Sequence, residues 1–311
     1  MRPVSPQPTV TIGLPVYNGE RFLAEALDSL LGQTFTDFEL IISDNASTDA
    51  TEEICGAYAR SDPRIEYRRS PENRGAAWNY NRVLELATGQ FFKWAAHDDI
   101  CAPTFLERCV ETFRSESSAV VLVYSRSTAI DEHGAVLRED WDRLDLREPT
   151  PHERIKHLVW NPADTGTSIF GLIRTSALRQ TRGHLAFPGA DYVTLAELAL
   201  LGEFREIPEL LFLRRFHRGM SRRANPTLAD VAEWFEPGSS NRVVLEYWTL
   251  LVQHLVSIKR APLGFRERLW CCAVLVPSWT RYWRRQLQKE LVSLPAELRR
   301  VRAARRRDVV T

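Results

Sequence analysis

The stretch Phe91-Phe92-Lys93-Trp94-Ala95-Ala96-His97-Asp98-Asp99 is an apolar run that ends abruptly at two adjacent carboxylates. Residues 91–96 have the length and composition of a strand that is buried on both faces. Turn-type residues and Pro103 follow, so the two acids lie at the carboxyl end of the predicted strand. Ligands of open α/β sheets bind at that edge, and carboxylate oxygens suit Mg²⁺ or Mn²⁺. Asp98 or Asp99 could instead cap a following helix, and both interpretations remain open at this point.

Upstream of this stretch, strand-like segments alternate with segments whose apolar residues recur at the helical period. Strands are predicted over 9–18, 38–43, 65–68 and 91–96, and helices over 20–33, 50–59 and 75–87. Such alternation is typical of a parallel sheet with helices on both faces. The strand over 38–43 also runs into polar residues, so their side chains are expected at the same sheet edge as Asp98 and Asp99.

Downstream, the sheet is expected to become mixed. Glu132-His133-Gly134 has the composition of a turn between strands at 128–130 and 135–137. The charged, irregular segment 139–151 is predicted to be a mobile loop. Further strands are predicted over 119–124, 167–173 and 210–217, and helices over 105–113, 152–160 and 192–201.

The C-terminal part has a different composition. Helices are predicted over 243–258, 264–275 and 279–307, with a break at Pro277, so the chain divides into 1–225 and 226–311. From Lys259 onward there are 14 Lys or Arg against 4 Asp or Glu, which leaves 27 bases and 36 acids in the first 258 residues. A basic helical tail that contains tryptophans is typical of a membrane-surface or polyanion contact. The alternatives are a helical cap on the body or an oligomer contact.

Composition bounds the class of protein. The chain has 311 residues, 44% of them hydrophobic, which is ordinary for a globular protein. Its five cysteines include no CxxC pair, which favours a reducing compartment over a disulfide framework. The first residues lack an apolar segment, and no apolar run reaches the ~18 residues of a membrane span. We therefore expect a cytoplasmic protein, with a peripheral position on the inner face of the membrane if the tail binds lipid.

Four short motifs occur in a fixed order at the predicted strand ends. They are Pro15-Val16-Tyr17-Asn18, Ser43-Asp44-Asn45-Ala46-Ser47-Thr48-Asp49, Glu72-Asn73-Arg74-Gly75 with Asn79 to Asn81, and His97-Asp98-Asp99. Together they resemble the signature of family 2 glycosyltransferases, and the resemblance covers about residues 9–217. It implies an α/β fold of the GT-A type, a Rossmann-like mixed sheet flanked by helices, to which this chain adds a C-terminal helical extension.

The resemblance also assigns roles at the donor side of the site. It implies that a nucleotide-diphosphate-sugar donor contacts Pro15, Tyr17, Asp44, Arg74 and Asp98. Asp44 would accept an N–H of the base, although an Asx turn explains the same residue. Arg74 would stack on or hydrogen-bond to the base, or lie in a surface turn. Asp98 matches the ribose side, but His97 replaces the first acid of the family's motif.

The metal and the acceptor follow from the same resemblance. Asp99 and His217 match positions that hold a divalent metal, Mn²⁺ or Mg²⁺, although His217 could be a surface histidine among Arg214, Arg215 and Arg218. Those arginines could themselves hold phosphate. Asp191 matches the general base that deprotonates the acceptor hydroxyl, although it could simply cap the helix over 192–201. Direct displacement with such a base inverts the anomeric configuration.

The sequence thus predicts an inverting, metal-dependent glycosyltransferase. The Gln-x-x-Arg-Trp motif of processive synthases does not occur, so transfer of a single sugar to a sugar, lipid-linked or small-molecule acceptor is favoured. A sugar-phosphate nucleotidyltransferase would need a glycine-rich phosphate loop, which Pro15-Val16-Tyr17-Asn18-Gly19 does not provide. A non-catalytic nucleotide-sugar-binding scaffold recruited by the basic tail is the alternative. Nucleic acid is not an expected partner, because the body is acidic.

Overall fold

The computed structural model describes residues 7–140, 143–160, 166–220, 224–225, 227–239 and 242–308. The elements of the first half are β1 (Val10–Val16), α1 (Leu23–Leu31), β2 (Phe38–Asp44), α2 (Thr51–Ser61), β3 (Ile65–Arg69), α3 (Ala76–Leu86), β4 (Phe91–Trp94), β5 (Ile100–Cys101), α4 (Phe105–Ser115), β6 (Val120–Asp131) and β7 (Val136–Asp140). The second half contains α5 (Pro151–Trp160), η1 (Ser168–Phe170), β8 (Leu172–Arg174), α6 (Thr175–Leu178), α7 (Ala190–Leu201), β9 (Glu203–Phe216), α9 (Leu228–Phe235), α10 (Glu246–Arg260), α11 (Phe265–Tyr282) and α12 (Arg284–Asp308).

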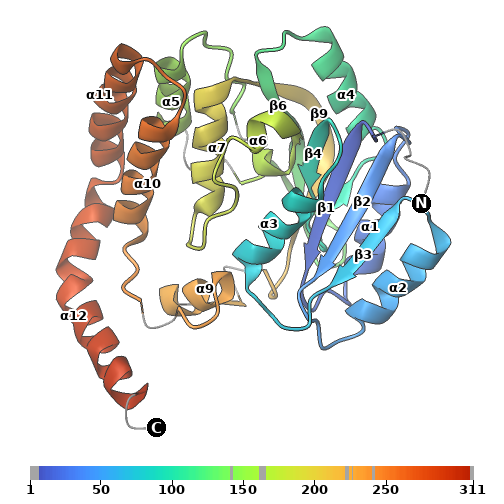
Figure 1. Cartoon of the computed structure of the whole chain (residues 1–311), viewed down its shortest axis with the longest axis horizontal. Coiled ribbons are helices and arrows are strands. Elements are labelled where there is room, and N and C mark those ends of the chain that lie inside the picture. Colours follow the sequence, from blue (N-terminus) through green and yellow to red (C-terminus); the bar gives the residue numbers. More distant parts are fainter. Residues whose placement is uncertain are drawn as a thin grey trace.

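The described strands form one mixed sheet in the order β3-β2-β1-β4-β8-β6-β9-β5, with β7 paired to β6 (Figure 1). β1, β2, β3 and β4 run parallel. β8 is antiparallel to both β4 and β6, while β9 is parallel to β6. The predicted change from a parallel to a mixed sheet is therefore confirmed, as are helices on both faces.

Close packing at the centre of the sheet explains the glycine in β1. Every residue of β1 is buried. A Cβ on Gly13 would lie 2.7 Å from the Phe92 ring and 2.8 Å from Val83, so only glycine lets α3 lie this close to the strands. Because β1 and β4 are parallel neighbours, their carboxyl ends lie together at one edge of the sheet.

Four predicted strands differ from the structure. The segments 119–124 and 128–130 are one continuous strand, β6, because it pairs along its length with β9. β9 likewise begins at Glu203, well before the predicted 210. The predicted strand 167–173 is wrong in its first part, since Ser168–Phe170 is a 3-10 helix and only Leu172–Arg174 pairs in the sheet.

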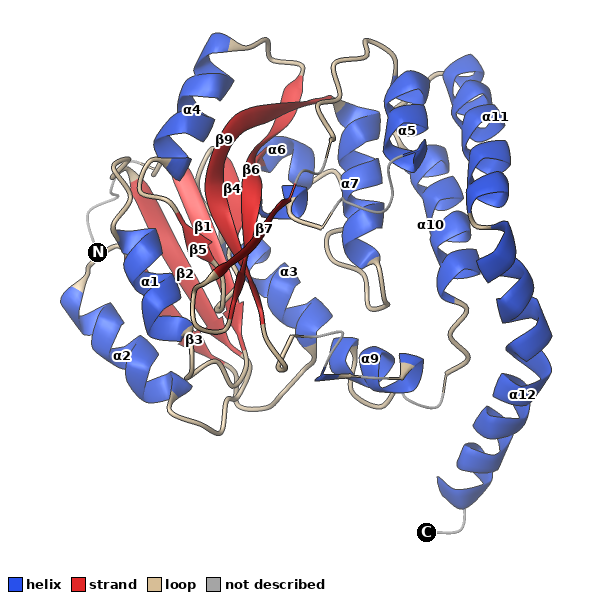
Figure 2. Cartoon of the chain, turned by 180° about the vertical axis from the view of Figure 1, so that it is seen from behind, coloured by secondary structure: helices blue, strands red, loops and turns tan. Residues whose placement is uncertain are grey.

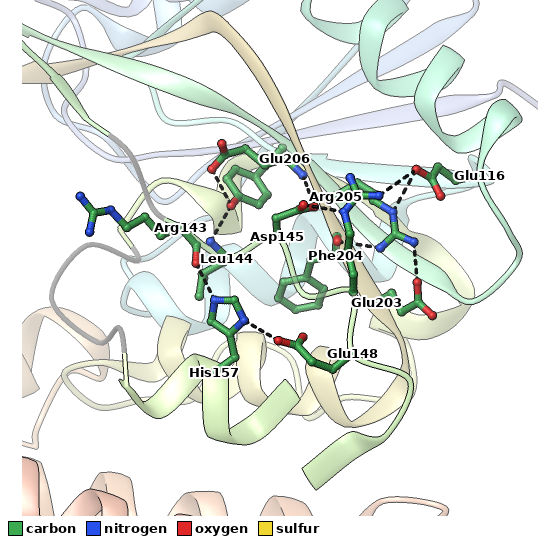
Figure 3. Close-up of polar contacts among 12 residues, drawn as sticks. Glu116, Arg143, Leu144, Asp145, Glu148, His157, Glu203, Phe204, Arg205 and Glu206 are labelled. Carbon is green, nitrogen blue, oxygen red and sulfur yellow. Dashed lines mark hydrogen bonds and ion pairs between the residues drawn. The ribbon is translucent and has the colours of Figure 1, made fainter. Parts of the chain in front are cut away.

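The segment 143–148 falls in the predicted mobile loop, but it is firmly attached (Figure 3). Leu144 and Leu146 are fully buried. The Leu144 backbone N–H donates to the Tyr124 hydroxyl at 2.8 Å, and the Phe204 N–H donates to the Leu146 carbonyl at 3.1 Å. His157 of α5 contacts the carboxylate of Glu148 at 2.7 Å. The apolar residues hidden among the charges of this segment thus make it part of the core, whereas residues 141–142 lie outside the described ranges.

The helices after residue 245 form an outer layer against α5 and α7 (Figures 1 and 2). Buried residues of this layer belong to the same hydrophobic core as β4, β6 and α7; they include Leu250, Leu251, Ile258, Cys271, Leu275 and Trp279. In the described chain no helix is both long enough and apolar enough to span a bilayer. The next helix after the predicted boundary, α9, packs on α3 of the sheet-containing part. The division of the chain into 1–225 and 226–311 therefore remains a proposal.

The predicted break at Pro277 is wrong, because α11 continues through it to Tyr282. Proline removes the N–H that would bond to the carbonyl four residues earlier. Both Pro277 and Ala273 are exposed, so water can bond to the carbonyl that loses its partner.

Candidate active site at the carboxyl edge of the sheet

A cleft of about 530 Å³ opens at the carboxyl ends of β1 and β4. Its walls come from the β1 end, α3, the segment after β4, the β9 end and α9. The residues used below that line it are Pro15, Tyr17, Arg21, Phe22, Asn45, Asn73, Asn79, Tyr80, His97, Asp98, Asp99, Phe170, Arg214, Arg215, His217 and Trp234. Both acids of the deciding stretch therefore face the cleft.

Asp98 is paired with His217, the residue that follows β9. The two side chains approach at 2.8 Å between His217 Nε2 and Asp98 Oδ2. The Gly219 N–H donates to His217 Nδ1 at 3.2 Å, so Nε2 carries the proton that is donated to Asp98. Burial acts to raise the pKa of Asp98, but the hydrogen bond from His217, with the nearby His97, lowers it below its usual value. Asp98 is thus held as a carboxylate.

Asp99 lies in a more deeply buried environment. Burial and repulsion from Asp98 raise its pKa to about 7, against the opposing effect of the Arg215 N–H, which donates to Asp99 Oδ1 at 2.9 Å. Arg215 is 2% exposed; its Nε donates to the Asp98 carbonyl at 2.9 Å and its guanidinium pairs with Glu25. A second negative charge in this position is costly, so a cation bound here would be stabilised.

A buried lysine lies next to the acids. Lys93 of β4 is fully buried, and its Nζ donates to the carbonyls of Trp94 and Phe170. The ammonium lies 4.5 Å from the Phe105 ring centroid. Its charge is among those that oppose the rise in the pKa of Asp99. Lys93 thereby joins β4 to η1, whose Phe170 lines the cleft.

The loops at the ends of β1 and β2 are fixed by amide side chains. Asn18, at φ 52°, accepts a hydrogen bond from the Thr48 N–H at 2.8 Å. Asn79 of α3 donates to the carbonyls of Val16 at 3.2 Å and Ser43 at 2.9 Å. The amides of the predicted motifs therefore set the shape of the cleft wall, because they bond to backbone groups that the strands leave unpaired.

Comparison with known proteins decides the family. The model of glycosyl transferase family 2 matches residues 11–182, which is more than half of the chain. The chain belongs to this family. E. coli chondroitin synthase is 27% identical over 213 residues, covering 68% of this chain and 29% of that protein. Putative glycosyltransferase EpsH of Bacillus subtilis is 28% identical over 210 residues, covering 68% and 56%. The chain thus spans less than two thirds of the length of these relatives.

Solved structures show the same fold. S. aureus TarS 1-349 in complex with UDP-GlcNAc superposes with a TM-score of 0.64 at 18% identity, covering 88% of this chain and 72% of that chain. Mannosyltransferase PcManGT from Pyrobaculum calidifontis, in complex with GDP-Man and Mn²⁺, superposes with a TM-score of 0.53 at 18% identity, covering 94% and 88%. The predicted GT-A fold with C-terminal helices is confirmed.

The fold brings Pro15, Tyr17, Asp98, Asp99 and His217 together around the cleft. These five predicted site residues come from three separate stretches of the chain, and their roles remain predictions.

Asp44 and Arg74 do not line the cleft. Asp44 is fully buried and accepts from the Ser47 N–H, three residues on, at 2.8 Å and from the Tyr67 hydroxyl at 2.9 Å, so its carboxylate holds the loop that follows β2. The Arg74 guanidinium lies 4.5 Å from the centroid of the Trp78 ring. Their neighbours Asn45 and Asn73 line the cleft, so the predicted contacts with the base remain untested proposals.

Asp191 lies in the first turn of α7, after Gly189 at φ 84°. It does not line the cleft, but it acts on Tyr80, which does. Burial, with the carboxylates of Asp98, Asp99 and Asp191, raises the pKa of Tyr80. Burial lowers the pKa of His184, which stacks on Tyr80 at 4.7 Å between ring centroids, and Asp191 opposes that shift. Asp191 is therefore near enough to Tyr80 and His184 to act on both, although it does not line the cleft itself.

Sequence reasoning missed several residues of the site. Glu25 and Phe22 hold Arg215, whose guanidinium lies 4.7 Å from the Phe22 ring centroid. Trp234 reaches the cleft from α9. Only Lys93 carried a usable signal, as a charge in the middle of an apolar strand.

The acidic and histidine side chains of the cleft suit a divalent ion only if a bound substrate supplies further oxygen ligands. Among the described residues no group of three or more His, Cys, Asp and Glu side chains is arranged to hold a metal. Mg²⁺ and Mn²⁺ at nucleotide sites bind through one or two carboxylates plus phosphate oxygens. The pKa of Asp99, raised by burial and by Asp98, is the feature that such an ion would relieve. Asp99 is thus suitable in type, whereas His217 would have to give up its hydrogen bond to Asp98 or the one from Gly219 to bind an ion, and the remaining ligands would come from the donor.

Proposed function

We propose that the protein is an inverting, divalent-metal-dependent glycosyltransferase that moves one sugar from a nucleotide-diphosphate sugar to an acceptor hydroxyl. The observation that carries the proposal is the buried acid pair at the sheet edge. Asp98 and Asp99 are held by His217 and Arg215 inside a cleft of about 530 Å³, a size that suits a small-molecule ligand. Family membership supports transfer of a glycosyl group.

In this proposal the cleft is divided by role. Asp98 faces the ribose, while Asp99 and His217 hold the ion. Pro15, Tyr17, Asp44 and Arg74 serve the nucleotide side. Arg214 and Arg215 both line the cleft, so both add positive charge where a diphosphate leaves. When bound, a divalent ion supplies charge neutralisation of the leaving diphosphate.

Asp191 acts as the general base on the acceptor side. Its carboxylate takes the proton of the acceptor hydroxyl as the oxygen bonds to the anomeric carbon and the bond to the diphosphate breaks. Attack from the side opposite the leaving group inverts the configuration.

The donor base and the acceptor remain open within the proposal. The TarS and PcManGT structures contain UDP-GlcNAc and GDP-Man, so UDP, dTDP and GDP sugars are the candidates. The acceptor would be a cell-envelope polysaccharide, a glycolipid or a secondary metabolite. The enzyme would act in the cytoplasm, partly at the inner face of the membrane, and without nucleic acid. Self-association through the C-terminal helices is the remaining option.

Donor binding is the first test. A ligand that binds the native state raises its melting temperature, so UDP-, dTDP- and GDP-sugars are screened with and without Mn²⁺. One donor class should raise the melting temperature, and Mn²⁺ should increase that effect. In calorimetry, Asp99→Ala should lose the dependence of nucleotide-diphosphate affinity on Mn²⁺. Wild-type affinity in this variant with Mn²⁺ present would show that Asp99 is not the ligand.

A second variant separates the enzyme from the scaffold alternative. Asp44→Ala should raise the donor KM, whereas Asp191→Asn should keep donor binding and lose turnover. Full turnover by Asp191→Asn would show that Asp191 is not the general base.

A further inference from the structure

We infer that the outward faces of α11 and α12 form a docking surface for anionic lipid. The inference is independent of the reaction, because it rests on side chains remote from the cleft. These two helices form the edge of the molecule farthest from β3 and α2 (Figures 1 and 2). We call the exposed side chains of residues 265–299 the outer face.

The outer face is unusually apolar. The described chain has thirteen exposed large hydrophobic side chains, and eight of them lie on α11 and α12. On α11, Phe265, Leu269 and Val276 follow one another at intervals of four and seven residues and are 75%, 54% and 38% exposed. Trp270 is 60% exposed beside them. Positions three, four or seven apart share one side of a helix, so these residues form a stripe.

α12 carries exposed apolar side chains of its own. Leu291 and Leu298, seven residues apart, are exposed, and Val292 between them is 82% exposed. A monomer gains nothing by leaving such a run of apolar side chains in water, and exposed apolar patches mark contact sites. Not every tryptophan of the basic tail can reach lipid headgroups. Trp279 is 4% exposed and belongs to the core. Trp270 remains, while Trp283 is half-buried.

The charge of the outer face is of one sign. Every residue from 265 to 299 is described, and the exposed ones include six bases but no Asp or Glu. The bases are Arg266, Arg281, Arg284, Arg285, Lys289 and Arg299. Among the ion pairs of the described residues none involves these six side chains, whereas the exposed Arg21, Arg68 and Arg147 of the body have carboxylate partners.

An anionic bilayer fits this combination better than other partners. Phosphate headgroups attract the six bases, and the apolar stripe can enter the boundary below them, where Trp270 finds both polar and apolar neighbours. A nucleic acid would meet the charges but leave the stripe in water. A second copy placed symmetrically on the same face would set these like charges against each other.

The test uses flotation of the full-length protein with vesicles of phosphatidylcholine, with or without phosphatidylglycerol. We expect binding to the anionic vesicles alone. Raising the ionic strength from about 0.1 M to about 1 M shortens the Debye length from about 10 Å to about 3 Å, so it should release the protein. Equal binding to both vesicle types, or to neither, overturns the inference.

Two variants assign the binding to the outer face. Arg285→Glu/Lys289→Glu should weaken binding at least thirtyfold, since each base near an anionic leaflet contributes roughly a factor of five. Phe265→Ser/Leu269→Ser should weaken it at both salt concentrations. The matched control is Arg60→Glu/Arg114→Glu on α2 and α4, where both arginines are exposed on the body. If the control loses as much binding as the first variant, net charge rather than the outer face is responsible.

Two further measurements separate other outcomes. Sedimentation equilibrium should give the same mass for wild type and Phe265→Ser/Leu269→Ser; a larger mass for wild type alone would assign the face to a second copy and overturn the lipid inference. The melting-temperature increase given by the donor should be unchanged in both variants. A protein that floats but binds no donor would contradict the proposed function and leave the lipid inference standing.

Discussion

The cleft edge of the sheet and the outer face of α11 and α12 depart from the usual distribution of side chains in opposite directions. In the cleft, polar and charged groups are buried: Arg215 is 2% and His217 7% exposed, and the Arg215 backbone N–H and the His217 ring are hydrogen-bonded to the acid pair. On the outer face, apolar groups are exposed, up to 82% for Val292. Buried charge is costly unless it is paired, and exposed apolar area stabilises nothing in a monomer. Each region therefore points to a ligand, one small and charged, the other extended and amphiphilic.

Between these regions lies an inner layer of the C-terminal helices, which behaves as ordinary core. There the side chains of α10 and α11 pack on α5 and α7. The C-terminal part is thus cap and candidate docking surface at once, with the two roles on opposite sides of the same helices.

The largest effect is expected in the cleft. Asp191→Asn keeps the size of the side chain but removes the base, so kcat should fall by at least ~10²-fold, and by up to ~10⁴-fold. Single-turnover kinetics with saturating donor measures the chemical step. A nearly unchanged rate would assign Asp191 to capping α7 instead. Phe265→Ser/Leu269→Ser, with a soluble acceptor, is the matched control and should keep the wild-type rate.

The next effect concerns the attachment of the inner layer. Arg182 donates from its backbone N–H to Glu197 Oε2 at 2.7 Å and through its guanidinium to Glu197, Gln253 and Ser257, so it links α7 with α10. Arg182→Met leaves Glu197 buried with the backbone N–H and the Ser257 hydroxyl but without its charged partner, and such a loss costs about 3–5 kcal/mol of unfolding free energy. Urea unfolding measures it. Arg266→Met, on the outer face, is the control and should change that free energy by under about 0.5 kcal/mol. Equal losses in both variants would contradict the distinction between layers.

A third effect depends on pH. His254 of α10 is buried next to Trp279, and burial, with the charge of Arg182, lowers its pKa from 6.5 to about 4 against the hydrogen bond to Leu250. As the pH falls from 6.5 to 4 the unfolded chain takes up this proton before the native one, so stability decreases. The loss reaches roughly 3 kcal/mol. Glu246 lines the same small cavity as His254.

The comparison variant for this effect is His254→Gln, which cannot titrate. Urea unfolding at a series of pH values should give a flatter profile for His254→Gln than for wild type in that window, because every other acid titrates in both proteins. Parallel profiles would place the acid sensitivity elsewhere.

The sequence predicts the strand ends and five of the residues around the cleft, because short apolar runs that stop at polar residues carry that information locally. It does not predict the partners. Glu25 pairs with Arg215 across 190 positions, and Gln253 with Arg182 across 71, so only the fold brings them together. Periodicity also could not separate the two sides of the C-terminal helices. Trp270 and Trp279 lie in one helix among similar neighbours, yet one is exposed and the other is in the core.

The smallest expected effect is the sharpest test of the outer face. Val292→Ser should change the free energy of unfolding by less than about 0.5 kcal/mol, because most of its side chain is already in water. Leu275→Ala, in the adjoining helix, removes a fully buried side chain and should cost about 2–5 kcal/mol. Urea unfolding of the two variants side by side compares them directly. If Val292→Ser cost as much as Leu275→Ala, another part of the fold would have to cover Val292, and the outer face could not receive a bilayer. If it costs almost nothing, folding does not account for an exposed valine on a cationic helix, and binding is left as the explanation.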